Sequence, residues 1–157
     1  PPRLSPMNYL LSLVKSFSMS DILLAKFMQT QIRFEFDNFS IVAELLETPL
    51  AKAVRQKLPF SSQANRWGEE IYFTTPVKEK LDGTESDLVE KGDVAYWPPG
   101  NAVAIFFGPT PASLGDECRA ASPVSIFARI VGDLSLLSSV CSGSKVLMSL
   151  DRKENIA

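Results

Sequence analysis

The sequence of 157 residues contains no histidine, and this absence narrows the chemistry available to the chain. Histidine is the side chain whose ordinary pKa lies nearest neutral pH, and it is the commonest metal ligand in proteins. Without histidine the chain forms neither a Ser–His–Asp or Cys–His catalytic pair nor a histidine zinc site. We therefore predict no metal, no cofactor and no catalytic residue of these kinds, and any acid–base chemistry falls to other side chains.

The chain also lacks an excess of positive charge, a metal-binding cysteine pair and a long apolar run. Its net charge is −2, which argues against nucleic-acid binding. Cys118 and Cys141 are far apart in sequence, and with no signal peptide in view we predict two reduced thiols. Lys15 and Asp21 interrupt the N-terminal apolar segment well short of the roughly 20 residues that span a bilayer. We predict a cytoplasmic domain that does not enter membranes.

Apolar periodicity divides the chain into three parts. Residues 1–27 are loosely helical and are predicted to be an extension outside the core fold. Residues 28–150 form the predicted domain, and residues 151–157 a loose tail. Two interpretations of the extension stay open: a docking helix for a partner or a second copy of the chain, and a segment that arises from translation upstream of the true start.

Short strand patterns dominate the domain. Ile32, Phe34 and Phe36 alternate with charged residues, as in a half-buried strand. Residues 102–107 are almost wholly apolar, which favours a strand buried on both faces. Further strands are expected over 39–43, 67–73, 94–97, 125–131 and 145–150. Residues 78–92 are expected to form a long hairpin or loop with at most short strands, and residues 108–123 a loop.

Two short helices complete the expected fold. The first begins at Thr48-Pro49 and ends before Pro59, and the second follows Gly132-Asp133 with Leu134 and Leu137 on its apolar side. Because closure of a sheet removes exposed strand edges, we predict a mostly β, closed barrel of about eight strands with two short capping helices.

Three blocks resemble, in order, the signatures of the prokaryotic cyclophilin-like family, long catalogued as a domain of unknown function. They are residues 67–73 (Trp-Gly-Glu-Glu-Ile-Tyr-Phe), 92–100 (Gly-Asp-Val-Ala-Tyr-Trp-Pro-Pro-Gly) and 106–111 (Phe-Phe-Gly-Pro-Thr-Pro). The resemblance covers roughly residues 29–150 and implies an eight-stranded barrel capped by helices. It extends more distantly to the cyclophilin prolyl isomerases.

The sequence departs from the isomerases where their pocket lies. The segment that should carry their amide-polarising arginine supplies Glu69 and Glu70, and Arg66 falls outside the matching motif. Ile105 and Val124 replace the pocket glutamine and histidine. By resemblance, only Phe107 is retained at the floor of the apolar cup.

We predict that the domain binds an unknown small molecule or peptide in an outer aromatic cleft. Adjacent residues of a strand point to opposite faces, so only one of Glu69 and Glu70 enters a given pocket. The alternatives are a weak prolyl isomerase and an interaction module that uses residues 1–27, including self-association. The predicted ligand-binding residues are Trp67, Glu69, Glu70, Tyr72, Trp97, Phe107 and Thr110.

Overall fold

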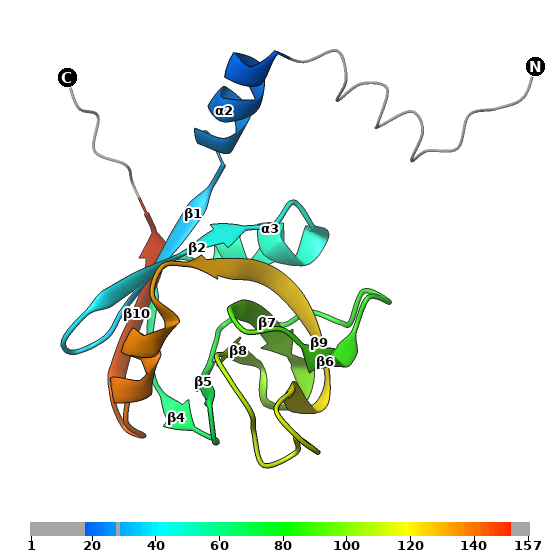
Figure 1. Cartoon of the computed structure of the whole chain (residues 1–157), viewed down its shortest axis with the longest axis vertical. Helices are drawn as coiled ribbons and strands as arrows, with labels where there is room; N and C mark the ends of the chain where they lie inside the picture. The colour runs from blue at the N-terminus through cyan, green and yellow to red at the C-terminus, as the bar shows by residue number, and fades with distance from the viewer. Residues whose placement is uncertain (1–17, 28, 152–157) are drawn as a thin grey trace, which may run out of the picture.

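Ten antiparallel strands form a single curved sheet in the computed structural model, which describes residues 18–27 and 29–151 (Figure 1). The strands are β1 (Gln31–Glu35), β2 (Ser40–Leu45), β3 (Phe60–Gln63), β4 (Asn65–Arg66), β5 (Glu70–Thr74), β6 (Ser86–Val89), β7 (Asp93–Trp97), β8 (Ala102–Phe106), β9 (Cys118–Val131) and β10 (Lys145–Leu150). Their order across the sheet is β3-β10-β1-β2-β9-β7-β8-β5-β4, and β6 pairs with β9 beside this path. The prediction of a mostly β domain is confirmed.

The sheet is open, so the prediction of a closed barrel of about eight strands is wrong. Its edge strands β3 and β4 follow one another in the chain but are not paired with each other. The intervening Ala64 is held instead by the turn that precedes β10, because its N–H donates to Ser144 O and its carbonyl accepts from Gly143 N. Strands β3 and β4 were missed from the sequence because they are short and have little apolar alternation.

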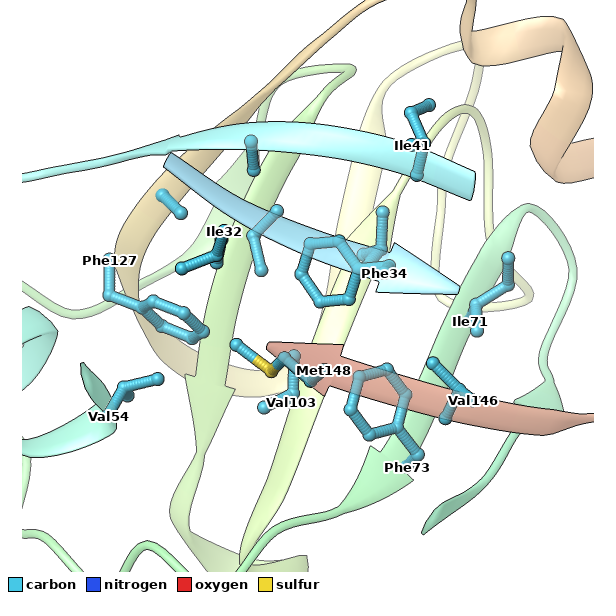
Figure 2. Packing of buried hydrophobic residues seen from close by; sticks show 14 of the residues in the cluster. Ile32, Phe34, Ile41, Val54, Ile71, Phe73, Val103, Phe127, Val146 and Met148 are labelled. Atoms are coloured by element: carbon cyan, nitrogen blue, oxygen red, sulfur yellow. The ribbon is translucent and has the colours of Figure 1, made fainter. Parts of the chain in front are cut away.

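The main core lies on the inner face of the sheet (Figure 2). Phe34 of β1 meets Phe73 of β5 edge-on, with ring centroids 6.2 Å apart. The other buried side chains that Figure 2 labels are Ile32, Ile41, Val54, Ile71, Val103, Phe127, Val146 and Met148. The strict alternation seen in the sequence of β1 thus places its apolar side chains in this core.

A second, smaller cluster lies on the outer face of the same strands. Ala104 and Phe106 of β8 belong to it, whereas their neighbours Val103 and Ile105 belong to the main core. The first half of β9 leaves the main sheet to pair with β6, and its Cys118, Ala120 and Val124 join this cluster. Strand β8 is therefore buried on both faces, as its apolar sequence predicted.

The segment 78–92 contains a single short strand, as predicted, whereas the loop predicted over 108–123 is partly strand. β6 lies within the first, and β9 begins at Cys118 within the second. Both thiols are free, with Cys118 buried and Cys141 exposed.

The helices agree in part with the prediction. Helix α3 (Pro49–Gln56) begins where expected, capped by the Thr48 side chain, which accepts from Ala51 N. The second expected helix is a 3-10 helix, η2 (Leu134–Ser139), with Leu137 buried. A further 3-10 turn, η1 (Pro98–Gly100), separates β7 from β8.

Helix α2 (Met19–Phe27) belongs to the predicted extension and points away from the sheet in Figure 1. Met19, Ile22, Leu23 and Leu24 are exposed on it. Residues 1–17 and 152–157 lie outside the described residues. Asp151, expected in a loose tail, is held by Arg33 at 2.8 Å. Within the described chain, no helix has the length and apolar character needed to cross a membrane.

Replacing Phe73 by alanine tests the central role of the inner core. Phe73 has no exposed surface, and truncating such a side chain removes transfer free energy and leaves a cavity. We expect a loss of about 3–5 kcal/mol in the free energy of unfolding, measured by urea denaturation. The exposed neighbour Thr74, replaced by alanine, should change it by less than about 1 kcal/mol. Equal effects of the two substitutions would contradict this account of the core.

Candidate ligand site

A tight hairpin between β4 and β5 brings Trp67 and Glu70 together. Trp67 N donates to Glu70 O at 3.0 Å, and Glu70 N donates to Trp67 O at 3.2 Å. Gly68, at the first position of the two-residue turn, has φ +61, which glycine adopts without steric cost. Residues directly opposite in such a pair project to the same face. The turn therefore aims the indole and the carboxyl group at the same space.

The loop after β8 is hydrogen-bonded to this turn. Glu69 N donates to Pro109 O and Phe107 N donates to Glu69 O, both at 2.9 Å. A Cβ atom at Gly68 would lie 2.9 Å from Pro111 Cδ, and one at Gly108 would collide with the Glu69 carboxylate. Only glycine fits at these two positions, because the turn and the loop approach each other so closely. The contact joins two blocks that are separate in the sequence, residues 67–73 and 106–111.

A cavity of about 280 Å³ lies on the outer face of the sheet beside the turn. It crosses β5, β8 and β7 and is bordered by the first half of β9. Its lining is Trp67, Glu70, Tyr72, Trp97, Ala104, Ala120, Ala121 and Val124. Aromatic side chains thus surround a space that small residues leave free.

Trp97 is held in place on two sides. Its indole N–H donates to Ser122 Oγ at 2.6 Å, which ties β7 to the bend of β9. A Cβ atom at Gly100 would lie 2.6 Å from the indole ring, so only glycine leaves room for this orientation. The Trp97 side of the cavity is therefore preorganised in the absence of a ligand.

Glu70 is the charged group of this cavity. Its side chain lies on the outer face of β5, because Ile71 and Phe73 enter the main core and strand alternation places Glu70 and Tyr72 on the opposite side. Glu70 is nevertheless only 7% exposed. Burial raises the pKa of its carboxyl group from 4.5 to about 7. No hydrogen bond or ion pair from the described residues reaches that carboxyl group.

A family model described as "Cyclophilin-like" matches residues 30–149. The chain belongs to the cyclophilin-like family. The solution structure of the hypothetical protein AF2241 from Archaeoglobus fulgidus is similar, with 41% sequence identity and a TM-score of 0.65. The match covers 76% of this chain and 93% of the archaeal one. None of the curated proteins compared with the chain matches it significantly.

Four of the predicted site residues in this cyclophilin-like domain line the cavity: Trp67, Glu70, Tyr72 and Trp97. Glu69 does not, because its exposed side chain lies over Gly108 outside the cavity. Thr110 organises the loop, donating from its hydroxyl to Arg119 O and accepting from Ala112 N. Of the two adjacent glutamates, Glu70 alone borders the cavity.

Phe107 is placed in the main core rather than at the floor of an outer cup. The Arg66 guanidinium lies over its ring, 5.0 Å from the centroid. Arg66 also donates to the carbonyls of Gly68, Ser138 and Val140. This arginine thus closes the end of the core and is already engaged by backbone acceptors.

The small residues of the lining were missed from the sequence. Ala104 and Ala120 carry no signal of their own, and only the packing of β9 over β8 shows that they leave space between aromatic rings. Val124, noted as a replacement for a pocket histidine, does border this cavity. The described residues contain no cluster of three potential metal-ligating acids or cysteines.

Replacing Glu70 by glutamine should make stability less dependent on pH. The folded pKa of about 7 exceeds the ordinary value of 4.5, so the folded state holds a proton that the unfolded state releases between these pH values. Raising the pH through this window therefore destabilises the wild-type protein. We expect Glu70→Gln to match it near pH 4.5 and to be more stable at pH 8, by roughly 2–3 kcal/mol.

Urea denaturation at both pH values measures this difference, with Glu69→Gln as the matched control. That control keeps Glu70 and should retain the wild-type decline in stability. A Glu70→Gln protein that loses stability equally at both pH values would show that the carboxyl group is a structural acceptor.

Proposed function

We propose that this protein is a binding module that takes a small organic ligand, or one side chain of a peptide, in the outer cavity. The observation that carries the proposal is the Glu70 carboxyl group, buried among aromatic side chains with no partner among the described residues. The oxygens of Glu70 are not among the fully buried unpaired atoms, so they are accessible from the cavity, where a ligand can supply the hydrogen-bond or ionic partner that the protein does not.

The dimensions of the cavity favour a small ligand. Its volume of about 280 Å³ lies just below the roughly 300–1,000 Å³ typical of ligand pockets. Aromatic rings supply contact area with little conformational entropy to lose, and a single polar group fixes the ligand's orientation. The hairpin and the Trp97–Ser122 hydrogen bond hold these groups in advance, which lowers the cost of binding.

The two tryptophans of the chain both line the cavity, which makes binding directly observable. We expect members of a panel of amines, amides and neutral aromatic fragments to shift both indole N–H signals in NMR spectra. A matched variant, Ala121→Leu, adds bulk at an exposed position of the lining and should weaken that binding at least tenfold.

Ser61→Leu is the control, since it adds similar bulk at an exposed position of β3 outside the cavity. It should leave the indole shifts unchanged. A panel without any binder, or binders that Ala121→Leu does not affect, would overturn the proposal.

A further inference from the structure

Three aromatic side chains from different parts of the sheet line the cavity together with Glu70. Trp67 comes from the β4–β5 turn, Tyr72 from β5 and Trp97 from β7. Each aromatic ring presents a negative face that attracts a cation, with tryptophan the strongest of the three types. The Glu70 carboxylate, when ionised, adds a full negative charge to the same cavity. The cavity therefore combines a carboxylate with aromatic rings, two kinds of group that bind organic cations.

The charged groups around the cavity leave the charge of an ionised Glu70 uncompensated. On β9, Arg119 is bound to Asp87 at 3.0 Å, and Arg129 lies 3.5 Å from the carboxylate of Asp93 at the start of β7. Beside the turn, Arg66 is engaged by backbone carbonyls and Glu69 lies over Gly108. The residues contributed by β8 and β9 to the lining are alanines and a valine. None of these contacts brings a cation to Glu70.

We propose that the ligand of the outer cavity is an organic ammonium cation, paired with the Glu70 carboxylate and in contact with the aromatic lining formed by Trp67, Tyr72 and Trp97. This inference rests on the proposed function and adds the chemical class of the ligand. Ala104 and Ala120 leave room for alkyl groups on the nitrogen, and such groups suit aromatic walls better than a strongly hydrated, unsubstituted ammonium does.

Charge and pH distinguish this class from a neutral ligand. The pKa of about 7 means that Glu70 is largely protonated at pH 6 and largely ionised at pH 8. A cation needs the ionised form, so its affinity should rise across this range. A neutral amide that accepts a hydrogen bond from the protonated carboxyl group would show the opposite trend.

Choline and its uncharged isostere 3,3-dimethyl-1-butanol are suitable probes, with binding to the full chain followed by the indole NMR signals. The charge of choline is permanent, so any pH dependence belongs to the protein. We expect choline to bind at least tenfold more tightly than the isostere at pH 8. We expect its affinity to fall roughly tenfold at pH 6, which follows from the fraction of ionised Glu70.

Glu70→Gln should reduce the preference for choline to twofold or less and remove its pH dependence. Glu69→Gln, one residue earlier and outside the cavity, should retain both. Equal binding of choline and the isostere to the wild-type protein, or tighter binding of choline at pH 6, would overturn the ammonium assignment. Binding of the isostere or of neutral fragments would still support the proposed function, whereas a cavity that binds no compound of any class would overturn both.

Discussion

Burial of the β7–β8 strand pair on both faces is the constraint on which the molecule depends. One set of alternating side chains enters the main core, and the other set supports the smaller outer cluster. A strand in this position has no face left for solvent, so the chain must supply a cover for the outer side. The first half of β9 and its partner β6 provide that cover. The cover is incomplete where alanines meet aromatic rings, and the cavity lies there.

The turn at Gly68–Glu69 converts this arrangement into a site. Its paired hydrogen bonds set Trp67 opposite Glu70, and the loop from Phe107 to Pro111 holds the turn against the end of β8. Glu69 and Thr110 contribute to the site indirectly, by fixing the position of this turn and loop. Arg66 works in the same way at the end of the core, where its guanidinium joins β4 to η2 across the Phe107 ring. Residues that look functional in sequence thus divide into those that border the cavity and those that hold its walls.

Glu70 carries an energetic conflict between stability and binding. Its burial favours the protonated form, which costs the folded protein stability as the pH rises above the ordinary range of a glutamate. An apolar side chain in the same place would avoid that cost. A ligand that pairs with the ionised carboxyl group would offset this loss of stability. Ligand binding therefore accounts for a carboxyl group at a buried position. The same titration makes the charge of the site adjustable near neutral pH.

Local patterns were sufficient for the parts of the fold that depend on near neighbours. The alternation in β1, the Thr48-Pro49 start of α3 and the apolar run of β8 each predicted an element that the structure contains. Glu69 lies in the turn before β5, so its position outside the cavity depends on that turn and not on strand alternation. The openness of the sheet, the pairing of β6 with β9 and the early start of β9 could not be predicted from local patterns, since they depend on pairing between distant segments. For the same reason the alanines of the cavity were invisible in the sequence and Phe107 was misplaced. The face of a strand on which a side chain lies follows from its neighbours in the sequence. The residues that pack against that face come from strands far away in the chain, so only the tertiary structure determines them.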